Sequence, residues 1–171
     1  MADDTTAPRS RSQLARGSAT TFLSLVVPVA VYFVLPLDRD TWRVGVLLGL
    51  VAVVAVLPVT IRHLATIDRS PHPLGAAVRA LALLLGLAVA GFATVNYALA
   101  ANTDQIPDLR TKVDGLYFTI VTMTSVGYGD IVPAGQTARA LVSLQIILTI
   151  TLIGGAIRMI GNLASRRHAD D

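Results

Sequence analysis

The chain has 171 residues, of which 53% are hydrophobic and 15% charged, with a net charge of +3. Soluble domains carry about a quarter charged residues, so this composition favours an integral membrane protein. The basic residues stand in short clusters at the ends of apolar runs, which argues against nucleic-acid binding, and the absence of cysteine excludes disulfides and thiolate metal sites.

Residues 1–20 are polar and contain three arginines. The apolar run that follows, Thr21–Leu37, lacks a small-x-small cleavage site, so we expect it to be retained as a transmembrane helix and not removed as a signal peptide. It is near the lower length limit for crossing a bilayer, and Pro28 inside it predicts a kink.

Three further apolar runs predict three more transmembrane helices: Val44–Ile61, Ala80–Ala101 and Ala140–Ile160. The run Ala80–Ala101 is rich in glycine and alanine, which lets a neighbouring helix approach closely. The last run carries polar residues, which usually face protein or water, so this helix is not expected to be surrounded by lipid. Its polar residues are Ser143, Gln145, Thr149 and Thr151.

A shorter segment between the third and fourth runs, Val113–Thr124, would span only about 18 Å as a helix, so it predicts a re-entrant half-helix. Residues 125–129 follow as a non-helical strip, which membrane proteins tolerate only against protein or a water-filled path. Gly127 and Gly129 can take left-handed backbone angles. If left- and right-handed residues alternate, successive carbonyls turn to one side and offer a cation a row of oxygen ligands.

The stretch "TMTSVGYGD", residues 122–130, resembles the selectivity-filter signature of the potassium channel superfamily: threonine, any two residues, threonine, any residue, then Gly-Tyr-Gly-Asp. The sequence around it, "GLYFTIVTMTSVGYGDIVPAGQTARALVSL", is similar to that family's pore helix, filter, outer-mouth loop and inner helix in the expected order. The resemblance covers residues 114–162 strongly and the third apolar run by position. It does not reach the first two runs.

The resemblance implies a role for each residue of the strip. The carbonyls of Val126, Gly127 and Tyr128, with the carbonyl and hydroxyl of Ser125, would coordinate dehydrated K⁺, and Gly129 would complete the filter. Around the filter, Asp130 would cap the outer mouth, and the Tyr128 side chain would enter a cuff containing Tyr117 and Phe118. Thr122 and Thr124 would support the filter from the end of the half-helix, which directs its partial negative charge at a central cavity.

This sequence departs from the family pattern at three places. Ser125 stands where threonine is usual and lacks the methyl group that stiffens the rotamer. Val121 replaces a carboxylate that in some members restrains the acid after the filter. The usual hinge glycine of the inner helix falls on Thr149, and glycines come only at Gly154 and Gly155. The candidate cavity and gate residues are therefore Thr149, Ile150, Ile153, Gly154 and Gly155.

We predict an all-α integral membrane protein with four transmembrane helices, a re-entrant pore helix and a selectivity filter, acting as a homotetramer in the plasma membrane. The predicted parts are a cytoplasmic N-terminal segment, a peripheral two-helix hairpin with a cytoplasmic linker, a pore module and a cytoplasmic tail. Their bounds are 1–20, 21–73, 74–163 and 164–171. Cytoplasmic termini place nine basic residues inside and five outside, in agreement with the positive-inside rule. Anionic lipids are candidate partners of Arg62, Arg69 and Arg79.

The predicted function is passive, K⁺-selective conduction without a cofactor, K⁺ being only the permeant ion. Two alternatives stay open: a weakly selective monovalent cation channel, and a non-conducting subunit that modulates other channels. An enzyme is disfavoured, because the three histidines lie in predicted loops and the tail. The first two helices lack the regular arginine series of a voltage sensor. The gating stimulus is therefore open between pH, lipid, tension, the filter and an unidentified regulatory partner.

Overall fold

The computed structural model describes residues 11–37, 42–67 and 73–169, and these residues form helices and loops without a strand. The helices in them are α1 (Arg11–Val34), α2 (Trp42–Ile67), α3 (Pro73–Asn102), α4 (Lys112–Met123) and α5 (Gln136–Ala169). Residues 1–10, Arg69 and the last two residues of the predicted tail lie outside the described residues, as does the side chain of Arg62.

The long helices extend beyond the apolar runs that predicted them. α1 starts at Arg11, inside the segment predicted as a polar N-terminal extension, and ends at Val34, before Pro36. α3 starts at Pro73, because proline is well tolerated in the first turn of a helix. α5 continues to Ala169, so the predicted boundary of the tail at residue 164 falls inside a helix. Hydrophobicity marks the part of a helix that suits the membrane, whereas the helix itself can continue into the polar residues beside it, and α1 and α2 continue through Pro28 and Pro58.

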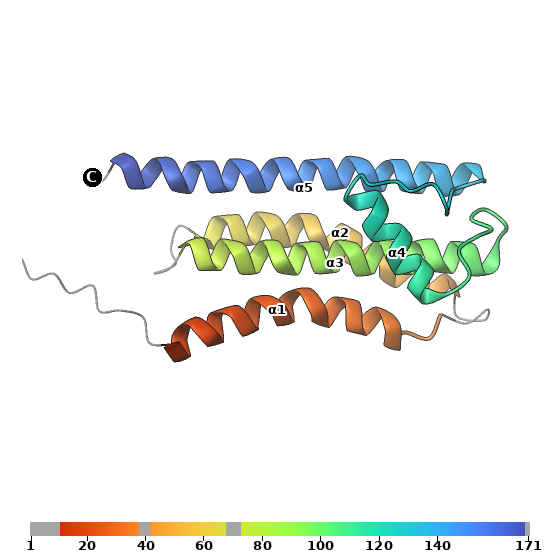
Figure 1. Ribbon diagram of the computed structural model, residues 1–171, viewed down its shortest axis with the longest axis horizontal. Helices are drawn as coiled ribbons and strands as arrows, with labels where there is room; N and C mark the ends of the chain where they lie inside the picture. The colour runs from red at the N-terminus through yellow and green to blue at the C-terminus, as the bar shows by residue number, and fades with distance from the viewer. Residues whose placement is uncertain (1–10, 38–41, 68–72, 170–171) are drawn as a thin grey trace, which may run out of the picture.

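α3 is the central helix of the fold (Figure 1). α1 and α2 each pack along α3, whereas α4 and α5 contact it over a smaller surface, and α4 also contacts α5. The two helices predicted as a peripheral hairpin are thus each held mainly by α3 and not by one another. The start of α1 and the end of α5 lie on the same side of the molecule, and α4 lies toward the opposite side (Figure 1).

Glycines allow the close approach of α1 and α2 to α3. A Cβ atom at Gly91 would lie 2.8 Å from Val53 Cγ2 and 3.1 Å from the Gly49 carbonyl oxygen of α2. On another face, a Cβ atom at Gly86 would lie 2.8 Å from the Leu25 carbonyl oxygen of α1. Close packing at the glycine-rich third helix, predicted from the sequence, is confirmed at these positions.

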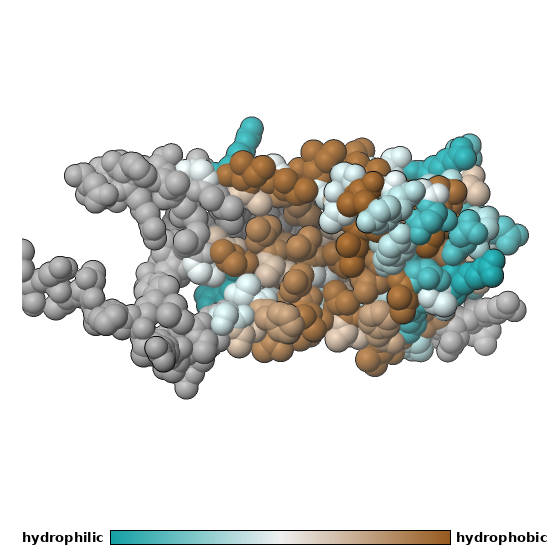
Figure 2. Space-filling view, viewed as in Figure 1, coloured by the Kyte–Doolittle hydropathy of each residue, from teal (hydrophilic) through white to brown (hydrophobic). Residues whose placement is uncertain are grey.

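On the face seen in Figure 2, apolar residues cover the middle of the molecule, and polar residues gather at the end that carries α4. Among the described residues, Gly75–Asn102 and Gln136–Arg158 are long and apolar enough to cross a bilayer. The apolar parts found in α1 and α2 are shorter, Ser18–Val34 and Arg43–Ala55.

Candidate functional site

The half-helix predicted before the strip is α4, and its first turn is fixed by a capping box. The Thr111 hydroxyl accepts a hydrogen bond from the Asp114 N–H at 3.1 Å, and Asp114 Oδ2 accepts one from the Thr111 N–H at 2.8 Å. Partial burial by itself raises the pKa of Asp114, but these hydrogen bonds and that from the Arg110 N–H outweigh it and lower the pKa below the ordinary value. The carboxylate therefore stays ionised at neutral pH and holds the start of α4.

The end of α4 leads directly into the strip. The Val121 carbonyl oxygen accepts hydrogen bonds from the Val126 N–H at 3.1 Å and the Gly127 N–H at 3.4 Å, and the Thr122 carbonyl accepts one from the Ser125 N–H. The Thr124 hydroxyl donates back to the Ile120 carbonyl at 2.8 Å. These bonds satisfy the last carbonyls of the helix and fix where the extended backbone begins.

Backbone handedness alternates along the strip. Ser125, Gly127 and Gly129 have positive φ angles of 59°, 56° and 78°, whereas Val126 and Tyr128 between them do not. This alternation is the one that turns successive carbonyls toward one side of an extended chain. The glycines were expected in this role. A left-handed angle at Ser125 was not expected. The spacing of two residues between Gly129 and Gly127, continued back to Ser125, could have predicted it.

Within one chain the strip is exposed to its surroundings. All residues from Ser125 to Asp130 are exposed, and added Cβ atoms at Gly127 and Gly129 would meet no atom of the described residues within 4 Å. Because a single chain supplies only one row of oxygens, a cation here would keep most of its water. The arrangement can replace a hydration shell only if other copies close around it.

Tyr117 of α4 holds the outer end of the strip. Its hydroxyl donates a hydrogen bond to Asp130 Oδ2 at 2.8 Å, and its ring stacks on Tyr128 with centroids 6.4 Å apart and an interplanar angle of 3°. Phe118, predicted to share this cuff, is instead buried in a cluster with other side chains, because successive residues of a helix point about 100° apart. That cluster contains Ile106, Leu109 and Ala138.

Comparison with known proteins decides the family. Residues 80–166, half of the chain, match a family model described as "Ion channel". The chain belongs to this ion channel family. The strip and the matching relatives place the channel in the pore-loop potassium channel superfamily, so the resemblance predicted from the sequence is confirmed.

The channel is similar to several curated potassium channels. It is 37% identical over 76 residues to two pore potassium channel b of Oryza sativa subsp. japonica, covering 42% of this chain and 21% of the relative. It is 34% identical over 86 residues to two-pore potassium channel 4 of Arabidopsis thaliana, covering 50% and 28%. Over 46 residues it is 44% identical to the voltage-gated potassium channel Kch of Escherichia coli, covering 27% and 11%. The alignments therefore span less than a third of each relative, and no solved structure matches significantly.

A buried polar cluster joins α3, α4 and α5. Asn96 Nδ2 of α3 donates to Thr119 Oγ1 of α4 and to Gln145 Oε1 of α5, both at 3.1 Å, and Gln145 Nε2 donates to the Thr119 carbonyl at 3.2 Å. All three side chains are fully buried. Gln145 was expected to face protein or water, and it faces protein.

The loop between the strip and α5 is held in place by one glutamine. The Gln105 carbonyl accepts hydrogen bonds from the Ala134 and Gly135 N–H groups, and its side chain accepts one from the Ala138 N–H at 2.9 Å, in the first turn of α5. Gln105 thus caps α5 from a distant part of the chain and fixes the loop that leads from the strip to α5.

The candidate gate residues on α5 separate into two faces. Ile150 and Ile153 are exposed, together with Ile146 and Ile157 at helical spacing. Thr149 is buried and donates its hydroxyl to the Gln145 carbonyl at 2.8 Å, which argues against a pore-lining position for Thr149.

Gly154 and Gly155 are exposed, and added Cβ atoms there would meet nothing within 4 Å. No contact among the described residues therefore requires glycine at either position.

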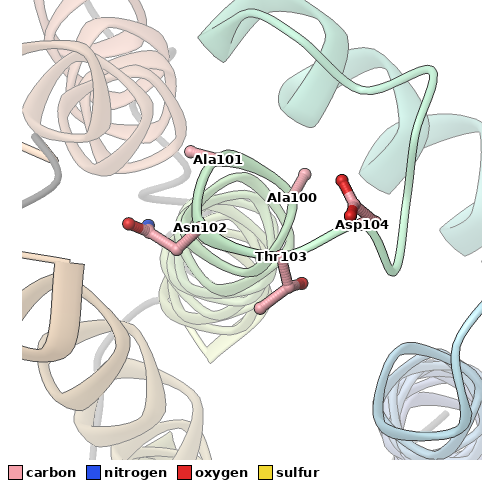
Figure 3. Close-up of a pocket in the computed structure, with 5 residues that line it drawn as sticks. All are labelled: Ala100, Ala101, Asn102, Thr103 and Asp104. Atoms are coloured by element: carbon pink, nitrogen blue, oxygen red, sulfur yellow. The ribbon is translucent and has the colours of Figure 1, made fainter.

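The end of α3 carries a shallow pocket of about 330 Å³, lined by Ala100 to Asp104 (Figure 3). The Asn102 amide and the Thr103 hydroxyl donate hydrogen bonds to two carbonyls of α3, those of Ala98 and Leu99. These side chains do not converge on a ligand, so we assign no site to this pocket.

Proposed function

We propose that four copies of this chain form a K⁺-selective channel in the plasma membrane, with conduction through the strip Ser125–Gly129. The observation that carries this proposal is the alternation of backbone handedness in a strip that is exposed on its open side. The carbonyls of Ser125, Val126, Gly127 and Tyr128, with the Ser125 hydroxyl, are the proposed K⁺ ligands, and ions pass without an energy source or cofactor.

The exposed surface of α5 supports assembly around the strip. Only 11% of the most apolar part of α5 is buried within the chain, compared with 50% for α3. Ile146, Ile150, Ile153 and Ile157 repeat at intervals of four, three and four residues, which places them along one stripe of the helix. In a tetramer this stripe lines the inner cavity or packs against the next copy.

The lengths of α1 and α2 support four membrane crossings. The apolar part of α1, Ser18–Val34, is about 26 Å of helix, which is at the lower limit for a crossing, and the apolar run Val44–Ile61 lies entirely within α2. With four crossings, both termini lie on one side, which the count of basic residues assigns to the cytoplasm. In this arrangement α1 and α2 flank α3 away from the pore.

The test is ion flux through purified protein in liposomes, combined with K⁺/Na⁺ reversal potentials in planar bilayers. Gly127→Ala should abolish K⁺ flux, because a left-handed angle costs a residue with a Cβ atom about 1–2 kcal/mol in each subunit. Gly75→Ala is the matched control, since Gly75 is helical and its added Cβ atom meets open space.

Each alternative has its own signature in this assay. Near-equal K⁺ and Na⁺ permeability would favour a weakly selective cation channel. A folded protein without K⁺ flux would favour a non-conducting subunit. Ba²⁺ block should weaken in Ser125→Ala, because that substitution removes the proposed hydroxyl ligand and leaves the carbonyl.

A further inference from the structure

The end of α1 is tied to the start of α4 by the only lysine in the sequence. Lys112 Nζ donates hydrogen bonds to the Phe33 carbonyl at 2.9 Å and the Leu35 carbonyl at 2.7 Å. α1 ends at Val34, so these carbonyls belong to its last turn and the residue after it, where a helix leaves acceptors without partners of its own. A cation at a helix C-terminus also interacts favourably with the helix dipole.

A second bond runs in the opposite direction at the same junction. The Tyr32 hydroxyl of α1 donates to the Lys112 carbonyl at 2.7 Å, and the Tyr32 side chain is fully buried. Gly115, one turn into α4, makes room for it, because a Cβ atom at that position would lie 2.8 Å from the Tyr32 hydroxyl oxygen. Hydrogen bonds therefore run in both directions across the junction. The Lys112 side chain of α4 caps the end of α1, and the Tyr32 side chain of α1 bonds the backbone of α4.

The residue type at position 112 fits this geometry. The two carbonyls lie two residues apart on one chain end, and an ammonium group is a compact point charge with three rotatable donors. The other thirteen basic residues are arginines, whose planar fork suits carboxylates better than converging carbonyls.

α4 connects this junction to the strip. It is a 12-residue helix whose first residue is Lys112 and whose last residues carry the hydrogen bonds that fix the beginning of the strip. Tyr117, midway along α4, bonds Asp130 at the strip's outer end. A tilt of the N-terminal end of α4 would therefore move both supports of the strip.

We propose that α1 is a positioning element for the filter, acting through the positioning residues Lys112 and Tyr32, and so sets ion selectivity from outside the pore module. This inference rests on the proposed channel function. It gives a role to a helix that the resemblance to potassium channels does not reach, and whose exposed apolar residues make it sensitive to its lipid surroundings. Those residues are Phe22, Leu23, Val26, Val27, Val31 and Val34.

The test is the K⁺/Na⁺ permeability ratio of full-length variants in planar bilayers. Lys112→Ala removes two charge-assisted bonds and should lower the ratio on the order of tenfold, and Tyr32→Phe, which removes one bond, about threefold. Lys112→Arg should recover part of the loss. Arg110→Ala is the matched control, because it removes a neighbouring positive charge from an exposed side chain but keeps the backbone N–H that bonds Asp114, and it should leave the ratio unchanged.

Ionic strength separates positioning from a surface-charge effect. If Lys112 acted only as a charge near the outer mouth, raising the salt to about 1 M would shorten the Debye length to roughly 3 Å. The charge would then be screened in the wild type and its loss would no longer change the ratio. Positioning through hydrogen bonds predicts that the loss persists at high salt. A ratio restored by salt would overturn the proposal.

The remaining outcomes are also decisive. Size-exclusion chromatography checks assembly of each variant, and if Lys112→Ala does not assemble, Tyr32→Phe decides. Unchanged selectivity in assembled Tyr32→Phe and Lys112→Ala, beside a conducting wild type, overturns the positioning role alone. A wild type that conducts no K⁺ overturns the channel function and this inference together.

Discussion

The polar cluster of Asn96, Thr119 and Gln145 predicts a measurable coupling between α3 and α5. Gln145→Leu keeps the approximate volume and removes two hydrogen bonds, from Asn96 Nδ2 and to the Thr119 carbonyl. Polar contacts between membrane helices contribute about 0.6 kcal/mol on average and up to about 1.7 kcal/mol. Two such bonds in a fully buried site therefore give an expected loss of about 1–2 kcal/mol in the free energy of unfolding.

Asn96→Leu should cost less than Gln145→Leu, although it also removes two bonds. The Asn96 Oδ1 atom is buried without a hydrogen-bond partner among the described residues. Leucine removes this unsatisfied acceptor, which relieves a penalty of about 1–3 kcal/mol and offsets the lost bonds.

The assay is reversible unfolding in mixed micelles by SDS titration, followed by the fluorescence of the single tryptophan, Trp42. The single variants and the double variant form a cycle, with Gln136→Leu, an exposed glutamine of the same helix, as control. We expect a coupling of about 0.6 kcal/mol between positions 96 and 145. A coupling below about 0.3 kcal/mol, the level of independent sites, would refute the reasoning.

Other predictions concern the support of the strip, helix packing and acid sensitivity. Tyr117→Phe removes the bond to Asp130 and should lower the K⁺/Na⁺ permeability ratio, whereas Tyr97→Phe should not; equal ratios for wild type and Tyr117→Phe would show that the bond is dispensable. Gly91→Ala should destabilise the protein by about 1–3 kcal/mol in SDS titrations, because the added Cβ meets the α2 backbone. Gly154→Ala should raise helix stability by about 0.5–1 kcal/mol, and if α5 bends there it should also reduce K⁺ flux; unchanged flux would exclude a hinge at Gly154. Because hydrogen bonds lower the pKa of Asp114 in the folded protein, its contribution to stability is complete above the ordinary aspartate pKa of about 4 and is lost as pH falls through the lowered value. Asp114→Asn should remove this part of the acid sensitivity in unfolding measured against pH.

The sequence by itself determined the features that depend on neighbouring residues. Apolar runs located the long helices, the short run Val113–Thr124 predicted α4 within one residue at each end, and the glycines marked where the backbone turns left-handed. These properties follow from hydrophobicity and local backbone sterics, which a short window contains. The same local reasoning missed the length of α1 and α5, because helices continue past their apolar part.

Only the tertiary structure decided which distant side chains meet. Gln145 contacts Asn96 across 49 residues, and Lys112 reaches the end of α1 across 77 and 79 residues. Thr149 lies on the buried face of α5 and not on the exposed stripe. Phe118 and Tyr117 are adjacent in α4 but point in different directions and contact different neighbours. Such pairings depend on how helices cross and rotate, and many residue types are compatible with each apolar run. The sequence therefore specifies the strip, whereas the packing of α1, α3 and α5 around α4 specifies how it is held.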